Sequence, residues 1–163
     1  MGTFPIETER LIIRPLKMSD VNEFYVMTRD EKVKKYVPYA CPLSLEDARY
    51  EFKKFYTKCD LRHDFYLAIL DKKKGKLVGA LIVTENIRNE YDMSHITAAR
   101  HRGKGYMKEC LQAFVNVMKK GSVLLFIIDK SNEPSYKLVS SLPKVEDVTQ
   151  NYKLRSHVFQ IIV

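Results

Sequence analysis

The spacing of apolar residues along the chain predicts strands and helices in a mixed order. Short apolar or alternating segments bounded by turn residues are expected as strands, and apolar residues that recur every three or four positions are expected on helices. The predicted strands cover residues 9–16, 65–70, 76–84, 91–97, 122–129 and 153–162. The predicted helices cover residues 20–29, 44–56, 108–120 and 133–142. The order predicts a mixed α+β fold with one helix between two consecutive strands.

Polar residues and glycines predict where several of these elements begin and end. Asp20 and Ser44 stand where helix N-caps are expected, each with an acidic residue in the following turn. Gly75 follows three lysines in a predicted hairpin turn that needs a positive φ. Gly79 lies inside a strand and indicates a bulge or a close packing approach. Gly121 is expected to end the third helix with a left-handed cap.

Length and composition favour one globular domain over residues 1–163. The chain is 45% hydrophobic, which suffices for a substantial core. No apolar run approaches the length of a membrane span, and the first ten residues lack the apolar core of a signal peptide. Cys41, Cys59 and Cys110 show no metal-ligand spacing, so we expect free thiols, with Cys110 in the core. These features favour a reducing cytoplasm and no membrane partner.

The net charge of +8 favours an anionic partner without naming one. The basic residues are scattered, and no basic face with interleaved aromatic residues or known nucleic-acid-binding module is present. Nucleic-acid binding is therefore the least favoured reading. Part of the charge is expected to serve a ligand rich in phosphate.

A basic turn with two glycines, residues 100–107, links the strand at 91–97 to the third helix. Arg102, Gly103, Lys104 and Gly105 stand directly before the helix begins. Glycines permit a tight turn, and the free N–H groups of the first helical turn, together with the helix dipole, attract anions. The turn is predicted to hold a pyrophosphate, although a solvated basic turn is the plain alternative.

The turn lacks the Walker pattern, because no Gly-Lys-Ser/Thr follows, and Lys108 replaces the third glycine of a dinucleotide fingerprint. Arg-x-x-Gly-x-Gly at the start of a helix resembles motif A of the GCN5-related N-acetyltransferases (GNAT). The opening segment, residues 7–16 with Ser19 and Asp20, is similar to the Rim-type branch, the ribosomal-protein-alanine N-acetyltransferases. The resemblance covers nearly the whole chain. It implies the GNAT fold: a mostly antiparallel mixed sheet of about six to seven strands with splayed central strands, flanked by about four helices.

The resemblance implies that acetyl-CoA is the acetyl donor. The pyrophosphate would lie on the backbone of the turn, and the pantetheine arm would enter the gap between the splayed strands and pair with backbone there. Asn132 matches the family asparagine that binds pantetheine. The cofactor-binding residues expected from the resemblance are Ile96, Thr97, Ala98, Arg102, Gly103, Lys104, Gly105, Tyr106, Met107 and Asn132.

Three residues are candidates for catalysis, and no metal is expected. Asp92 stands where Rim-type sequences commonly carry a glutamate and is the leading candidate for the base, although it could equally be a surface carboxylate. His95 has a suitable pKa but replaces a tyrosine, and it points to the face of the strand opposite Asp92. Ser135 is expected near the leaving sulfur. Val139 occupies the place of the family's general-acid tyrosine, so this chain departs from the pattern there.

Two functions follow from the resemblance. The leading one is an N-acetyltransferase that moves the acetyl group directly to a primary amine, either a protein N-terminus or a small-molecule amine. The alternative is a non-catalytic acyl-CoA-binding or regulatory domain. The implied partners are acetyl-CoA and an amine acceptor, and the chain is expected as a monomer or a homodimer.

Overall fold

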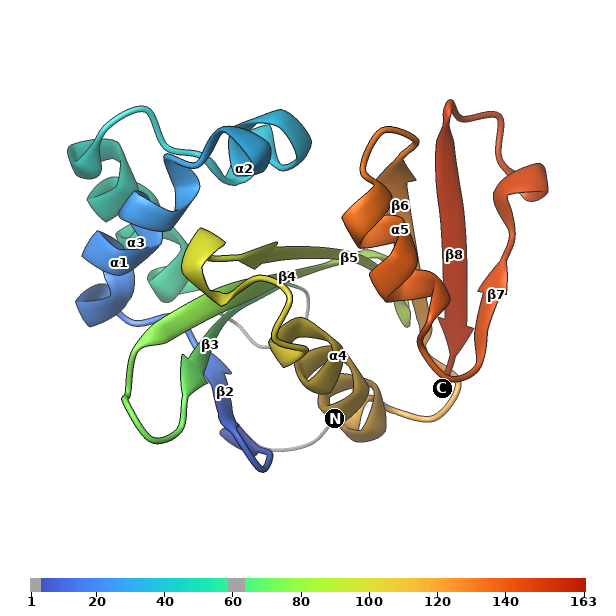
Figure 1. Cartoon of the computed structure of the whole chain (residues 1–163), viewed down its shortest axis with the longest axis horizontal. Helices are drawn as coiled ribbons and strands as arrows, with labels where there is room; N and C mark the ends of the chain where they lie inside the picture. The colour runs from blue at the N-terminus through green and yellow to red at the C-terminus, as the bar shows by residue number, and fades with distance from the viewer. Residues whose placement is uncertain (1–3, 59–63) are drawn as a thin grey trace.

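The computed structural model describes residues 4–58 and 64–163, in which eight strands form one open sheet (Figure 1). The order across the sheet is β1-β2-β3-β4-β5-β6-β8-β7, and every neighbouring pair is antiparallel except β5 with β6. The strands are β1 (Ile6–Glu7), β2 (Leu11–Pro15), β3 (Asp64–Asp71), β4 (Leu77–Ile87), β5 (Glu90–Thr97), β6 (Val123–Asp129), β7 (Val145–Asp147) and β8 (Ser156–Ile162).

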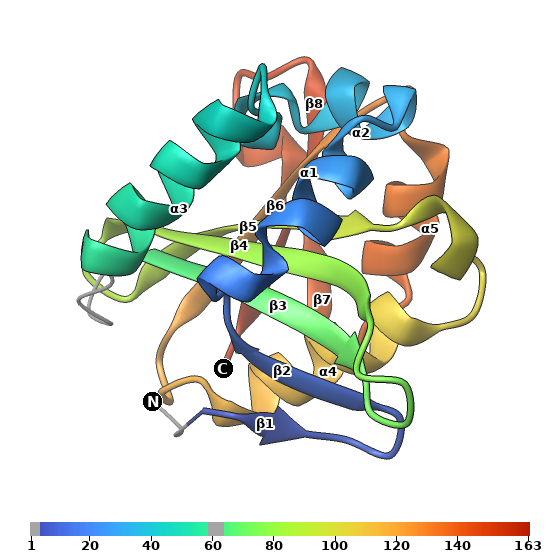
Figure 2. The same cartoon turned by 90° about the vertical axis from the view of Figure 1, so that its left-hand side faces the viewer.

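Helices cover both faces of the sheet. The α-helices are α1 (Val21–Thr28), α2 (Glu31–Tyr36), α3 (Leu45–Lys58), α4 (Tyr106–Val117) and α5 (Glu133–Ser140). Figure 2 shows α1 and α3 on one side of the sheet and α4 on the other. The core is divided accordingly: one apolar cluster packs β2–β6 and β8 against α4 and α5, and a second packs β2–β5 against α1, α2 and α3.

The predicted α+β fold with a mostly antiparallel sheet is confirmed, and the sheet is larger than expected. The additional strands β1 and β7 are two and three residues long, too short for a period to appear in the sequence. Helix α2 was not predicted either, because it has no apolar stripe: Val33 is its only buried residue. The expected interior position of β6 is confirmed, since it lies between β5 and β8.

The central strands part along their length, as expected. β5 pairs with β6 only at Glu90–Val123, Tyr91–Leu124 and Asp92–Leu125. Beyond Asp92, β5 continues to Thr97 beside β4, while β6 continues to Asp129 beside β8. The backbone edge of β5 that faces β6 is therefore unpaired from this fork onward, which creates a place where a ligand can pair with the strand.

Gly79 marks a close approach of two backbones next to this gap. A Cβ atom there would lie 2.4 Å from the carbonyl oxygen of Ile96 and 3.3 Å from Cε of Met107. The β3–β4 register also shifts beside Gly79, so both readings of this glycine are confirmed. Only glycine lets β4, β5 and the start of α4 meet at this separation.

One predicted helix end and one predicted side-chain cap are wrong. Helix α4 ends at Val117, and Gly121 adopts its positive φ of 85° in the following turn, where its N–H donates to Val163 O. Asp20 makes no side-chain cap for α1, because its carboxylate instead accepts bonds from the Arg14 guanidinium and from Lys17 N. By contrast, Ser44 caps α3 as expected, since its Oγ accepts from Asp47 N.

Two of the three cysteines lie in the described part of the chain, and both are free thiols. Cys110 is fully buried in the core, as predicted, and burial raises the pKa of its thiol strongly. Cys41 is half-buried beside α2, whereas Cys59 falls outside the described residues. None of the described helices combines the length and the apolar character that crossing a bilayer requires.

Candidate functional site

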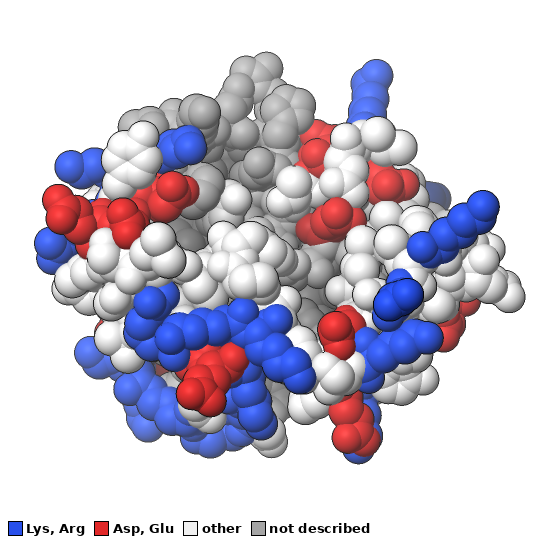
Figure 3. Space-filling view, turned by 90° about the horizontal axis from the view of Figure 1, so that it is seen from above, with Lys and Arg blue, Asp and Glu red and all other residues white. Residues whose placement is uncertain are grey.

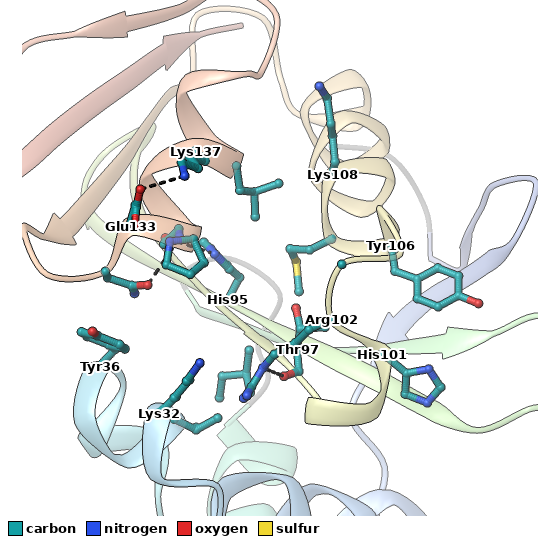
Figure 4. A pocket seen from close by; sticks show the side chains of 18 of the residues that line it. Lys32, Tyr36, His95, Thr97, His101, Arg102, Tyr106, Lys108, Glu133 and Lys137 are labelled. Carbon is teal, nitrogen blue, oxygen red and sulfur yellow. Dashed lines mark hydrogen bonds and ion pairs between the residues drawn. The ribbon is translucent and has the colours of Figure 1, made fainter.

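A cavity of about 630 Å³ opens where β5 and β6 part (Figure 4). Its walls come from four places: the end of β5, the glycine turn with the start of α4, helix α2, and the turn into α5. Segments far apart in the sequence thus meet around one space. Of the predicted site residues, those that line it are His95, Ile96, Thr97, Arg102, Gly103, Gly105, Tyr106, Met107, Asn132 and Ser135.

The glycine turn presents backbone donors to this cavity. Gly103 and Gly105 adopt φ angles of 72° and 77°, and a Cβ on Gly103 would meet nothing within 4 Å. The first bond of the helix runs from Glu109 N to Gly105 O. Within the described residues, no N–H from Gly103 to Lys108 has a hydrogen-bond acceptor. A run of unpaired N–H groups at a helix N-terminus is an anion-binding arrangement.

Arg10, at the β1–β2 turn, contacts both the glycine turn and the first turn of α4. Its guanidinium donates to Lys104 O at 2.9 Å and pairs with Glu109 at 2.6 Å. It also stacks 4.6 Å over the ring of Tyr106. Glu109 in turn accepts from Thr8 Oγ1, so the start of α4 is fixed to the N-terminal hairpin. Sequence reasoning missed this clamp because its members are about a hundred positions apart and follow no motif.

The side chains of the turn do not all face the cavity. The Arg102 guanidinium pairs with Asp30 at 2.7 Å and donates to Thr97 O, and Arg102 N donates to Ala99 O. Lys104 lines a separate cavity on the α1 side. Figure 4 shows the ring of Tyr106 pointing away from the centre of the cavity. The predicted role of the turn in cofactor binding therefore falls mainly on backbone atoms.

Hydrogen bonding along β5 reduces the number of residues whose backbone N–H could bind pantetheine. Ala98 N donates to Val78 O within the sheet, and Ala98 lines the separate cavity on the α1 side. Because antiparallel bonding alternates along a strand, Ile96 also turns its N–H toward β4, whereas His95 and Thr97 turn theirs toward the gap. Of the three residues expected to pair with pantetheine, only Thr97 presents its N–H to the gap.

His95 and Ser135 meet across the gap. Nε2 of His95 lies 3.3 Å from Ser135 Oγ, and Nδ1 is buried with no partner in the described structure. Burial lowers the pKa of His95 to about 4, so the ring is neutral at pH 7. A bare lone pair at Nδ1 is less costly than an unpaired N–H, which favours the tautomer with the proton on Nε2. Ser135 then accepts from His95, and its own O–H is available to a ligand.

Asp92 lies at the fork, on the opposite face of β5 from His95, as the alternation predicted. Its Oδ1 is buried and has no hydrogen-bond partner among the described residues. Ser94 follows on the same face and accepts a short hydrogen bond from Tyr39 Oη. Desolvation around its hydroxyl raises the pKa of Tyr39, although most of the side chain is exposed, and the nearby Asp92 carboxylate raises it further. Asp92 is thus a half-buried group at the point where the strands part.

Helix α5 places the remaining predicted residues. Asn132 Oδ1 accepts from Ser135 N and caps the helix, which leaves its amide nitrogen for a ligand. Tyr136 packs on the rings of His157 and Phe159, away from the cavity. Val139 is fully buried in the core, so the position of the family's tyrosine does not face the cavity here.

Several cavity residues were not predicted from the sequence. Lys32, Lys108 and Lys137 add positive charge to its walls, and Lys137 pairs with Glu133 at 2.7 Å. Tyr36 also lines the cavity, and its Oη donates to Ser131 O at 2.9 Å. This bond joins α2 to the turn before α5. Figure 3 shows that Lys and Arg side chains gather along one side of the molecule, with acidic side chains between them.

The cavity suits an elongated anionic ligand, with cations and free N–H groups at one part and the parted strands at another. Among the described residues, no group of three or more His, Cys, Asp or Glu side chains is placed to hold a metal ion. The chemistry available is that of backbone donors, one neutral histidine, one hydroxyl and one carboxylate at the fork.

The sequence model of the acetyltransferase (GNAT) domain matches residues 10–142. The chain therefore belongs to the GNAT acetyltransferase family, and its sheet and five helices form the GNAT fold. None of the curated protein sequences matches this one significantly.

Solved structures agree in fold. A GNAT-family acetyltransferase from Bacillus anthracis is 20% identical, with 96% of this chain and 97% of that chain covered and a TM-score of 0.78. Ribosomal-protein-S5-alanine acetyltransferase from Vibrio fischeri is 16% identical, with coverage of 96% and 94% and a TM-score of 0.76. The ribosomal L7/L12 α-N-protein acetyltransferase RimL in complex with coenzyme A is 15% identical, with coverage of 98% and 97% and a TM-score of 0.78. At such identities the likeness shows the fold alone, so the Rim-type branch stays a prediction.

Proposed function

We propose that the protein is an acetyl-CoA-dependent N-acetyltransferase that moves the acetyl group directly to a primary amine. The observation that carries this proposal is the cavity at the fork of β5 and β6, with His95 and Ser135 on one face and Asp92 on the other. Its location in the cytoplasm, where acetyl-CoA is made and used, is part of the same proposal.

The cavity fits the donor. Unpaired N–H groups from Gly103 to Lys108 match a pyrophosphate, and Lys32, Lys108 and Lys137 add attraction for phosphate. The free N–H of Thr97 on the unpaired edge of β5 matches an amide of the pantetheine arm. When bound, acetyl-CoA supplies a thioester whose carbonyl carbon is attacked by the amine. The N–H groups of His95 and Thr97 face the gap and serve as candidate donors to the developing oxyanion.

Asp92 is the candidate base on the acceptor side. The amine must be neutral to attack, and the nitrogen must lose a proton as the C–N bond forms. The buried, unpartnered Oδ1 of Asp92 is placed to take that proton directly or through one water. Because Asp92 lies on the face of β5 opposite His95, the two groups would serve different proton transfers.

Ser135 and His95 serve the leaving group. As the C–S bond breaks, negative charge gathers on sulfur, and the Ser135 O–H can donate to it. Nε2–H of His95 donates to Ser135 Oγ and holds the hydroxyl in that direction. His95 therefore positions Ser135: with the proton on Nε2 the ring donates to Oγ, so the Ser135 O–H is not used on the ring and stays free for sulfur.

The direct test measures thiol release from acetyl-CoA with a panel of primary amines, together with the mass of the product. Amine-dependent release of coenzyme A and an amine heavier by one acetyl group are expected, without acetylation of the enzyme. Thiol release that ignores the amine, or an acetylated enzyme, would contradict direct transfer.

The alternative function is a non-catalytic acyl-CoA-binding domain. The buried Val139, where the family carries a tyrosine, is its main support. The contact of His95 with Ser135 favours the enzyme, because it supplies a second way to assist the leaving sulfur. Binding of acetyl-CoA without transfer to any amine would favour the alternative.

A further inference from the structure

A second kind of cavity lies on the other face of the sheet, between α1, α3 and the turn at Pro38–Ala40. Its volume of about 370 Å³ lies in the range of small-molecule sites. Buried residues form its floor, and they are Phe24, Ala48, Phe52 and Ile82. We call it the apolar cavity.

Large apolar side chains surround the apolar cavity without being buried. Tyr39, Leu43 and Tyr50 are 69%, 88% and 65% exposed. Single exposed apolar residues are common, but three around one cavity mark a site for an apolar ligand. Two carboxylates, Asp47 and Glu51, lie one helical turn apart on α3 beside them. The lining therefore combines an apolar interior with negative charge, which suits a cation that carries an apolar group.

The apolar cavity is linked to the fork. Ile82 on its floor is the cross-strand partner of Ser94, and strands are spaced about 5 Å apart. Tyr39, at its edge, donates to Ser94 Oγ, and Asp92 follows two residues away on the same face of β5. An amine nitrogen near Ser94 and Asp92 would thus lie close to a group seated over Ile82.

We propose that the apolar cavity binds the side group of the acceptor, and that the acceptor is a primary amine carrying a bulky aliphatic or aromatic group close to its nitrogen. The proposal rests on the proposed function, because it assigns the cavity to the acceptor of that reaction. Both an arylalkylamine and a peptide that begins with a large apolar residue have this chemistry.

Steady-state kinetics on the full chain test the preference. We expect kcat/KM for 2-phenylethylamine to exceed that for ethanolamine by about tenfold or more. Burial of one or two methylene groups already accounts for a tenfold difference, and the phenyl ring is larger than that. Peptides that begin with phenylalanine or with serine separate the two sources: preference within the peptides points to a protein N-terminus, and activity on the small amine alone points to a metabolite. The proposal would be overturned if kcat/KM for ethanolamine equalled or exceeded that for 2-phenylethylamine, and if the serine peptide likewise equalled or exceeded the phenylalanine peptide.

Variants locate the preference in the apolar cavity. Tyr50→Ala removes part of its exposed edge, and Cys41→Phe fills its interior. Each should raise KM for the apolar amine about tenfold and leave KM for acetyl-CoA unchanged. Val26→Ala is the matched control, since Val26 is 70% exposed on α1 but does not line this cavity. An unchanged KM for the apolar amine in folded Tyr50→Ala and Cys41→Phe would overturn the assignment.

A binding measurement separates this proposal from the proposed function. In a Cys59→Ser background, Cys41 is the accessible thiol, because Cys110 is fully buried. We expect 2-phenylethylamine to slow alkylation of Cys41 at mildly alkaline pH, and ethanolamine to have no effect. If no amine is acetylated although acetyl-CoA binds, the proposed function fails, and protection of Cys41 would still support binding at the cavity. Equal alkylation with and without the apolar amine would overturn it.

Discussion

Ser135 Oγ and His95 Nε2 lie 3.3 Å apart, in a contact that spans 40 positions of the sequence and bridges the gap between β5 and α5. Neither residue alone suggests a pair, because one lies on a strand and the other at a helix start. In the proposed reaction, the pair would act together on the face of the cavity where sulfur leaves. Three of the predictions below concern the proton-handling residues at the fork.

Ser135→Ala should lower kcat about ten- to a hundredfold and leave acetyl-CoA affinity nearly unchanged, because its hydrogen bond strengthens only as charge gathers on sulfur. Steady-state kinetics and isothermal titration give the two quantities. Ser140→Ala is the control on the same helix, since Ser140 is exposed and outside the cavity. Equal turnover in wild type and Ser135→Ala would mean that sulfur leaves unaided.

His95 should make stability depend on pH. Burial lowers its pKa from the ordinary 6.5 to about 4, so between these values the unfolded chain binds a proton that the folded chain does not. The free energy of unfolding should therefore fall as pH drops through this window, and the contribution is complete above the upper value. Comparing denaturant unfolding near pH 4.5 and pH 7, His95→Gln should show a pH dependence smaller by about 1–3 kcal/mol. An unchanged slope in His95→Gln would contradict the burial of a neutral ring.

Asp92→Asn should lower turnover by roughly a hundredfold or more, the usual scale for loss of a general base, and keep acetyl-CoA affinity. Turnover at pH 7 and binding by isothermal titration are the measurements. Glu146→Gln, an exposed carboxylate on β7, is the control. If Asp92→Asn keeps its rate, the proton leaves to water, and the rate should then rise with pH only as the amine itself deprotonates.

Gly79→Ala should destabilise the fold and disturb the site together. The new methyl group would lie 2.4 Å from Ile96 O, so β5 must move, at a cost of about 1–3 kcal/mol or more. Gly75→Ala is the comparison: Gly75 has a φ of 63° but nothing within 4 Å of a Cβ, so only backbone strain of about 1 kcal/mol is expected. Denaturant unfolding measures both. Equal losses in the two variants would contradict the close approach at Gly79.

The sequence predicted the elements whose pattern is local. Periodicity predicted β4, β5 and β6, and the glycine turn predicted that a helix follows it directly. The short strands β1 and β7 were not predicted, because they carry too few residues to show a period. Contacts between distant segments were not predicted either, because the bonds of Arg10 to Lys104 and of Tyr36 to Ser131 follow no spacing rule. The direction of a side chain was the weakest inference, since the Arg102 guanidinium pairs with Asp30.

Titration calorimetry on Gly103→Glu tests whether acetyl-CoA binds with its pyrophosphate on the glycine turn. Gly103 has a φ of 72° and open space beside it, so glutamate would add a negative charge at the phosphates. Gly75→Glu, at a hairpin tip with a φ of 63°, carries the same charge and similar strain away from the cavity. We predict that Gly103→Glu weakens acetyl-CoA binding at least tenfold, about 1.4 kcal/mol, while Gly75→Glu binds as wild type does. Wild-type affinity in a folded Gly103→Glu protein would contradict the account.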